Sequence, residues 1–133
     1  MPFCKLAWLI DDDQTANFYS EFILKTNDFA AEARSFTNPQ EALAELEASV
    51  ASGTFPEFIF LDLNMPILDG WKFLEVFRQL PQSVKDKCTL YILSSSVDED
   101  DINLSKLYEE VRDFLSKPLK KRDLENIKFQ SRR

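Results

Sequence analysis

The chain has 133 residues, a formal net charge of −7 at pH 7 and a hydrophobic content of 44%. This length suits one domain with a substantial core, and the hydrophobic content is too high for a disordered chain. The negative charge argues against a nucleic-acid-binding protein. No apolar stretch approaches the roughly 20 residues of a membrane span, and residues 1–5 lack a signal-peptide pattern. We therefore expect a single cytoplasmic domain over residues 1–133, with no membrane and no nucleic acid among its partners.

Histidine and cysteine usage narrows the chemistry further. The chain has no histidine, which excludes Ser-His-Asp and Cys-His catalysis and the usual histidine-containing zinc sites. It also means that the chain cannot itself carry a phosphohistidine. Its two cysteines, Cys4 and Cys88, fit no metal-ligand spacing. We interpret them as buried or half-buried thiols in a reducing compartment.

The first third of the chain predicts a strand, a helix and a second strand. Residues 6–10 form an apolar run of strand length. The next segment has apolar residues at helical spacing, and we interpret its aromatic side chains as core. The members of this stripe are Phe18, Tyr19, Phe22 and Ile23. A weaker strand is expected near residues 31–36.

A second helix is predicted from the residues that are typical of a helix N-terminus. Asn38, Pro39 and Glu41 suit the N-cap, the first helical position and a capping-box acid. Gly53 is expected to end this helix. Its predicted apolar stripe consists of Ala42, Leu43, Leu46 and Val50.

Residues 58–61 are a short apolar run, which is typical of a strand buried on both faces. Asp69-Gly70 follows soon after, and we interpret it as a turn and helix start, not as a metal site. The helix is expected over residues 70–80, with Pro81 ending it. Its inward residues are predicted to be Phe73, Leu74 and Phe77.

The last third predicts two more strands and two more helices. Residues 90–93 form a strand that runs into three serines, and Asp98 is expected to cap a helix with an acidic first turn. Residues 111–115 suggest an edge strand because Asp113 interrupts the apolar run. Residues 120–129 form the last helix. The buried stripe of the helix after Asp98 is predicted to be Leu104, Leu107 and Tyr108.

Five strands thus alternate with five helices. Such alternation predicts an α/β domain with a doubly wound parallel sheet covered by helices on both faces. Right-handed crossovers place the carboxyl ends of all the strands at one edge. The acids of residues 11–13, Asp62, Ser94 and Lys117 follow four of these strands, so we expect them to converge.

The chemistry of this set points to phosphoryl transfer. Clustered carboxylates repel one another, and Mg²⁺, which prefers oxygen ligands, relieves that repulsion. A lysine ammonium suits a phosphoryl oxygen, and a hydroxyl supplies a hydrogen bond. The natural nucleophile is Asp62, which would form an acyl phosphate.

Four motifs in order carry a family resemblance: Ile10-Asp11-Asp12-Asp13, the segment from Leu61 to Gly70 (Leu-Asp-Leu-Asn-Met-Pro-Ile-Leu-Asp-Gly), Leu93-Ser94-Ser95 and Ser116-Lys117-Pro118. Together they resemble the receiver domain of bacterial two-component response regulators, over nearly the whole chain. The resemblance implies a flavodoxin-like, five-stranded sheet of order 2-1-3-4-5.

The resemblance also implies roles for individual residues. Asp62 would be the phosphoacceptor, Lys117 would pair with the phosphoryl group through a cis Lys117–Pro118 bond, and Phe114 would be the switch aromatic. Ser94 would supply the hydroxyl. The implied Mg²⁺ ligands are Asp12, Asp62 and the backbone carbonyl of Asn64, with Asp11 acting through water.

Several residues keep a plainer interpretation. Asp13 is best explained as the start of the next helix. Ser95 and Ser96 are equally well explained as loop, and Phe114 equally well as static core. Each alternative makes a different structural prediction.

The function implied is a stand-alone receiver that accepts a phosphoryl group from a sensor histidine kinase or a histidine phosphotransfer protein. It would have no output domain and would signal to an unknown downstream protein through its fourth helix, fifth strand and last helix. It would catalyse only its own phosphorylation and dephosphorylation. Two alternatives remain: an aspartate-nucleophile phosphatase, although Asn64 occupies the place of its second acid, and a flavodoxin-like carrier, although the acids of residues 11–13 would repel a flavin phosphate.

Overall fold

Five parallel strands form one sheet in the order β2-β1-β3-β4-β5. The computed structural model describes residues 2–65, 69–95 and 98–131; Pro66, Ile67, Leu68 and Ser96 of the sequence motifs lie outside them. The chain begins in the middle of the sheet, moves outward to β2, and then crosses back to add the remaining strands. This confirms the predicted strand order. The strands are β1 (Cys4–Ile10), β2 (Ala30–Phe36), β3 (Phe58–Leu61), β4 (Thr89–Ser94) and β5 (Val111–Ser116).

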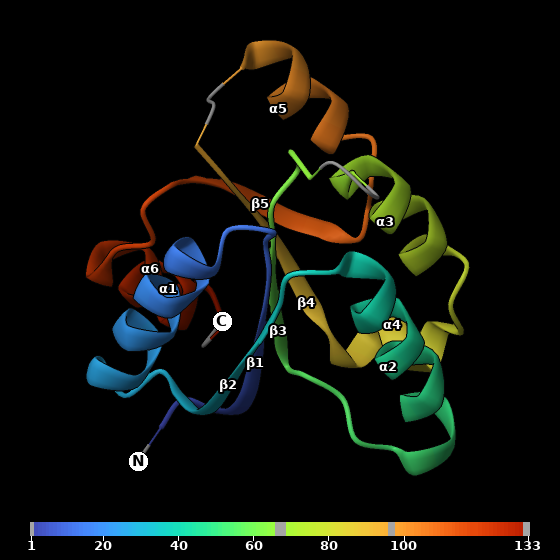
Figure 1. The fold of residues 1–133 in the computed structure, drawn as a ribbon, viewed down its shortest axis with the longest axis horizontal. Coiled ribbons are helices and arrows are strands. Elements are labelled where there is room, and N and C mark those ends of the chain that lie inside the picture. Colours follow the sequence, from blue (N-terminus) through green and yellow to red (C-terminus); the bar gives the residue numbers. More distant parts are fainter. Residues whose placement is uncertain (1, 66–68, 96–97, 132–133) are drawn as a thin grey trace.

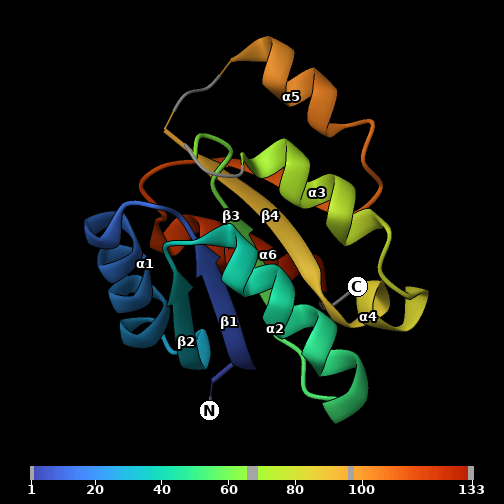
Figure 2. The ribbon, with the colours of Figure 1, turned by 45° about the vertical axis from the view of Figure 1, so that its right-hand side comes forward.

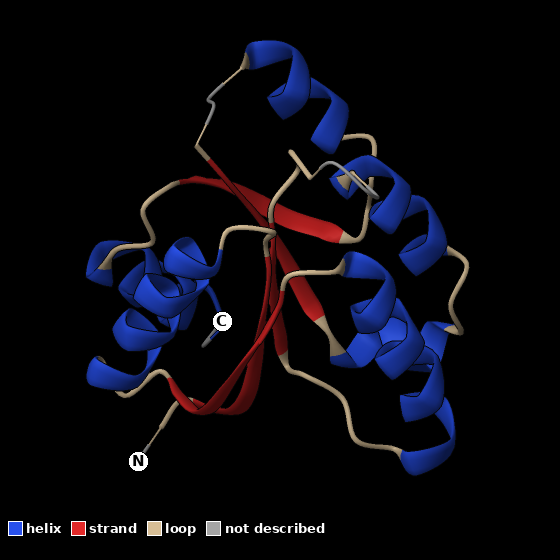
Figure 3. Ribbon diagram, in the orientation of Figure 1, coloured by secondary structure: helices blue, strands red, loops and turns tan. Residues whose placement is uncertain are grey.

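Helices cover both faces of the sheet (Figures 1 and 3). Helices α1 (Gln14–Thr26) and α6 (Lys121–Ser131) lie on one face, and α2 (Pro39–Ser52), α3 (Gly70–Arg78) and α4 (Gln82–Lys87) lie on the other. Helix α5 (Glu99–Ser105) lies beyond the carboxyl end of β4, near α3 (Figure 2). Within the described ranges, no helix has the length and apolar character needed to cross a membrane.

The prediction of five helices was wrong by one. Helix α4 has six residues and buries one apolar side chain, Val84. A helix this short shows no apolar period in the sequence, because the period needs about two turns to appear. The preceding helix ends at Arg78, two residues earlier than predicted.

Alternate residues of each inner strand pack into two separate cores. In β3, Ile59 and Leu61 face α2, α3 and α4, whereas Phe58 and Phe60 face α1 and α6. All four side chains are buried. This burial on both faces is why the strand reads as a continuous apolar run. Cys4 and Cys88 are buried free thiols, as predicted.

Helix starts follow the predicted signals. The side chains of Asp13, Asn38, Asp69 and Asp98 each accept backbone N–H groups in the first turn of the helix they precede. These bonds satisfy donors that the helix leaves unpaired. Gly53 ends α2 in the left-handed region at φ 75°, where a residue without Cβ is unstrained.

The expectation that the aromatic residues of the first helix are core was wrong. Phe18, Tyr19 and Phe22 are 74%, 44% and 57% exposed. The buried residues of α1 are Asn17, Ser20 and Leu24. These lie at positions i, i+3 and i+7, on the opposite side of the helix from the aromatic residues. The core aromatics of α3, Phe73 and Phe77, are buried as predicted.

The predictions of two further apolar stripes were partly wrong. Val50 is 48% exposed and Ser49 is buried in its place, with its hydroxyl donating to the Glu45 carbonyl at 2.8 Å. Leu104 and Leu107 are 39% and 70% exposed. The seven-residue α5 lies at the rim of the sheet and ends at Ser105, so Leu107 lies beyond the helix to which it was assigned. The prediction that β5 is an edge strand is confirmed.

Candidate functional site

The register of β1 against β3 places two aspartates side by side. Ile10 pairs with Leu61, and the N–H of Asp62 donates to the Ile10 carbonyl at 2.9 Å. The N–H of Asp11 donates to the Phe36 carbonyl at 3.0 Å, which fixes the end of β1 against β2 as well. Asp11 and Asp62 are therefore held at the same edge, and both are buried.

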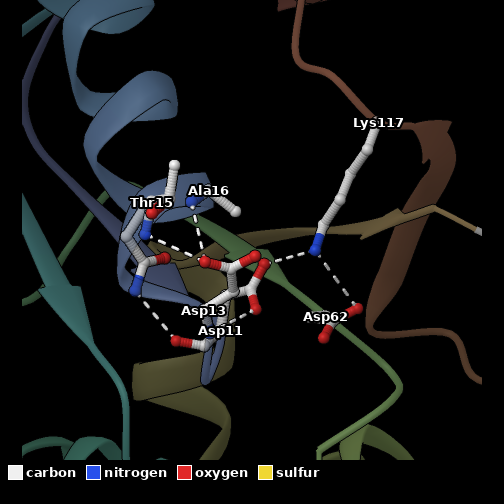
Figure 4. A network of polar contacts seen from close by, with 7 residues as sticks. Asp11, Asp13, Thr15, Ala16, Asp62 and Lys117 are labelled. Carbon is white, nitrogen blue, oxygen red and sulfur yellow. Dashed lines mark hydrogen bonds and ion pairs between the residues drawn. The ribbon is translucent and has the colours of Figure 1, made fainter.

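Asp12 joins this pair from the exposed side. Carboxylate oxygens of Asp11, Asp12 and Asp62 all lie within 4.8 Å of one another. Three carboxylate oxygens so arranged are a ligand set suited to a hard divalent cation. Asp13 is excluded from the cluster because its side chain caps α1, accepting from the N–H groups of Thr15 and Ala16 at 2.9 and 3.3 Å (Figure 4). The plainer interpretation of Asp13 is thus confirmed.

Lys117 brings a positive charge to the pocket from the end of β5. Its N–H donates to the Ser94 carbonyl at 2.8 Å, and the Lys117–Pro118 bond is cis, as predicted. Its ammonium donates to Asp11 Oδ2 and lies 3.6 Å from Asp62 Oδ1 (Figure 4). The lysine therefore contacts both buried carboxylates.

The electrostatics single out Asp62. Burial, followed by repulsion from Asp11 and Asp12, raises its pKa from 3.8 to about 6, although the Lys117 charge and a backbone hydrogen bond from Asn64 act in the opposite direction. Desolvation and like charges both disfavour a carboxylate. A bound cation would reverse this penalty, because it stabilises the ionised form.

The remaining sequence-predicted residues lie around this pocket. Ser94 is fully buried at the end of β4. Asn64 is exposed beside the pocket, just after Asp62 and Leu63. Phe114 on β5 is partly buried and packs against the core that faces α2, α3 and α4.

Two contacts near the pocket were not predicted from the sequence. The side-chain amide of Asn17 donates to the Asp11 carbonyl at 2.8 Å. Gly70, the first residue of α3, donates its N–H to the Leu63 carbonyl at 2.9 Å and so closes the loop that follows Asp62. Asn17 had only a weak signal, a polar residue in register with Leu24, and the contact of Gly70 depends on tertiary packing.

Comparison with known proteins gives consistent matches. A sequence model described as the response regulator receiver domain matches residues 7–128. A two-component response regulator from Cytophaga hutchinsonii is 32% identical with a TM-score of 0.89, covering 98% of this chain and 97% of that one. The Mn²⁺-bound form of response regulator Rcp1 is 27% identical with a TM-score of 0.72, covering 93% of this chain and 88% of that one.

One curated relative is much longer than this chain. The cyclic di-GMP phosphodiesterase response regulator RpfG of Xanthomonas campestris pv. campestris (strain 8004) is 31% identical over 118 residues. The match covers 87% of this chain but only 29% of RpfG.

Proposed function

Because this chain belongs to the response regulator receiver domain family, we propose that Asp62 accepts a phosphoryl group from a histidine kinase or a histidine phosphotransfer protein. A carboxylate oxygen of Asp62 attacks the phosphorus of the donor phosphohistidine as the P–N bond breaks. The electron pair of that bond leaves with the imidazole, and the product is an acyl phosphate. The observation that carries the proposal is the buried Asp62 carboxylate between two further carboxylates and Lys117.

Mg²⁺ is the proposed cofactor. Asp12, Asp62 and the backbone carbonyl of Asn64 would hold it, with Asp11 acting through water. The clustering of three carboxylates and the raised pKa of Asp62 support a cation here, as does a 27%-identical relative described in its Mn²⁺-bound form. The ion would neutralise charge on the phosphoryl oxygens in transfer.

Lys117 and Ser94 are proposed to contact the oxygens of the phosphoryl group once it is attached to Asp62. The ammonium of Lys117 already lies 3.6 Å from Asp62 Oδ1, within reach of an oxygen placed beyond it. Ser94 ends the adjacent strand and would donate its hydroxyl hydrogen to a phosphoryl oxygen. Both contacts form only in the phosphorylated state, so they bias the conformational equilibrium.

Phe114 is the proposed switch residue. It lies on the edge strand β5, is partly buried, and packs against the core that faces α2, α3 and α4. Movement of Ser94 toward the phosphoryl group would draw the segment after β4 with it, and Phe114 would turn into the vacated space. The face formed by α5, β5 and α6 would then change shape and bind a downstream protein. The chain would act in the cytoplasm as a signalling module, with self-catalysed phosphorylation and dephosphorylation as its only reactions.

A direct experiment is incubation of the protein with phosphoramidate and Mg²⁺, followed by intact-mass spectrometry. We expect a mass gain of one phosphoryl group that disappears in Asp62→Asn. Asp69→Asn is the matched control, because it removes a nearby carboxylate yet retains an N-cap side chain. Persistence of the gain in Asp62→Asn would overturn the assignment, as would the absence of any gain in the wild-type protein.

A further inference from the structure

Helix α1 presents a polar stripe to the interior of the protein. Asn17 is 3% exposed and Ser20 is 5% exposed, whereas Phe18 and Phe22 on the other side of the helix face solvent. Asparagine is a poor residue for a helix interior, and burial of its amide costs free energy unless the amide is hydrogen-bonded. This unfavourable orientation points to a specific contact that Asn17 makes.

That contact is with the acidic loop. Asn17 Nδ2 donates to the backbone carbonyl of Asp11 at 2.8 Å, in a buried environment. The carbonyl lies beyond the last hydrogen bonds of β1, because the Ile10 carbonyl accepts from Asp62 and the Asp11 N–H donates to Phe36. A buried carbonyl without a partner is costly, and the Asn17 amide supplies a donor that carries no charge.

The same loop is closed by two further bonds. The N–H of Asp13 donates to Asp11 Oδ1 at 3.0 Å, and the backbone N–H of Asn17 donates to the Asp13 carbonyl at 3.1 Å. The first bond holds the Asp11 side chain, and the second holds the start of α1. The Asn17 side chain then links the end of the strand to the helix.

The geometry of a peptide group gives this link a consequence for Asp12. The carbonyl of Asp11 and the N–H of Asp12 belong to one planar unit. An amide that fixes the direction of this carbonyl also restricts the plane of the peptide, and with it the position of the Asp12 Cα from which the side chain leaves the backbone. The bond of Asn17 is to this backbone carbonyl, so any effect of Asn17 on the two carboxylates acts through the peptide group.

We propose that Asn17 is a positioning residue of the acidic pocket: its side-chain amide holds the Asp11–Asp12 peptide so that both carboxylates converge with Asp62 on a divalent cation. This rests on the proposed Mg²⁺ site. It adds a residue that touches neither the cation nor the phosphoryl group. Residues behind metal ligands typically alter metal affinity about 10- to 100-fold when they are substituted.

The test compares Asn17→Leu, Asn17→Ser and Ser20→Ala with the wild-type protein. Leucine has a similar size but no donor, and serine is polar but too short to reach the carbonyl. Ser20→Ala changes the same buried stripe one turn away and serves as the control for stability. Mg²⁺ affinity is measured by titration calorimetry, and thermal unfolding is measured without Mg²⁺.

We expect both Asn17 variants to bind Mg²⁺ about 10-fold or more weakly, and Ser20→Ala to retain the wild-type affinity. Wild-type affinity in a folded Asn17 variant would overturn the inference. The inference would also be overturned if Ser20→Ala lost Mg²⁺ affinity together with stability, because the loss of affinity would then follow from general destabilisation of α1. If the wild-type protein itself does not bind Mg²⁺, the proposed cofactor is wrong. This outcome is distinguishable from a wrong role for Asn17, in which the wild-type protein binds Mg²⁺ and the Asn17 variants bind it equally well.

A second measurement needs neither Mg²⁺ nor activity. In metal-free protein, the backbone amide resonances of Asp12 and Asp13 should shift in the Asn17 variants and stay in place in Ser20→Ala. The side-chain amide of wild-type Asn17 should exchange its protons slowly, because it is buried and bonded. Fast exchange would overturn the inference even if neither Asn17 variant folded.

Discussion

A Cβ atom on Gly70 would lie 2.7 Å from the carbonyl oxygen of Asp62 and 2.7 Å from the Cα of Leu63. Both neighbours are backbone, so they cannot yield by a change of rotamer. We predict that Gly70→Ala destabilises the protein by about 1–3 kcal/mol and sharply slows phosphorylation, because the backbone that carries Asp62 must move. Urea unfolding and phosphoramidate labelling would measure the two effects.

The other glycine of the chain supplies the control. Gly53 has φ 75° but open space around its Cβ position. Gly53→Ala should therefore cost about 1 kcal/mol through backbone strain and leave the labelling rate unchanged. Equal losses of labelling in the two variants would show that Gly70 acts only through global stability.

The raised pKa of Asp62 predicts a pH-dependent stability. In metal-free protein the carboxyl has a folded pKa of about 6 against an ordinary value of 3.8. The folded state therefore binds more protons than the unfolded state between these values, and stability falls as the pH rises from about 4 to about 6. Above this window the ionised group costs up to about 3 kcal/mol.

We accordingly expect Asp62→Asn to be more stable than the wild-type protein at pH 7.5 without Mg²⁺, with a smaller difference at pH 5. Thermal unfolding at the two pH values checks this. Saturating Mg²⁺ should stabilise the wild-type protein more than the variant, because it removes the charge penalty. An equal difference at both pH values would contradict the assignment of the raised pKa to Asp62.

Asp12 is predicted to contribute a large part of the Mg²⁺ affinity of the pocket. Asp12→Ala should lose at least about tenfold in Mg²⁺ affinity, with little change in stability, because the side chain is exposed. Calorimetric titration measures the affinity. Asp13→Asn is the matched control: it removes an adjacent carboxylate but preserves the cap of α1, so its affinity should stay near that of the wild-type protein.

The proposed switch predicts a long-range response to a phosphoryl mimic. Beryllofluoride with Mg²⁺ should shift backbone NMR resonances at Phe114 and along α6, as well as at the pocket. Tyr108 should also respond, since its hydroxyl donates to Glu75 Oε1 at 2.7 Å and ties the segment before β5 to α3. Changes confined to the acidic pocket would contradict the switch while leaving phosphoacceptance intact. The same titration of Asp62→Asn should give no shifts at Phe114.

The strands and their carboxyl-terminal acids could be predicted from sequence for a physical reason. A central strand buried on both faces reads as an unbroken apolar run, and the β3 boundaries, Phe58 and Leu61, were predicted correctly. Parallel topology then brings Asp11 and Asp62 together without further information. The match to the receiver domain family favours that interpretation over the phosphatase and the flavodoxin-like carrier.

The orientation of α1 could not be predicted in the same way. Its sequence offers two candidate stripes, one aromatic through Phe18 and Phe22 and one mixed through Asn17 and Leu24. Hydrophobicity alone favours the aromatic one, but the buried carbonyl of Asp11 needs a donor, and the side-chain amide of Asn17 supplies it. Local apolar patterns carry no information about such a backbone requirement.

The pairing of Ile10 with Leu61 has a consequence for how the chain tolerates changes in length. Because side chains alternate between faces, inserting or deleting one residue in β3 would exchange its two apolar faces and shift Asp62 by about 3.3 Å relative to Asp11. The packing of the apolar core therefore determines the spacing of the two aspartates at the edge of the sheet. Length changes in the exposed connection around Gly53 lie outside the strands, so they should leave the spacing of Asp11 and Asp62 unchanged.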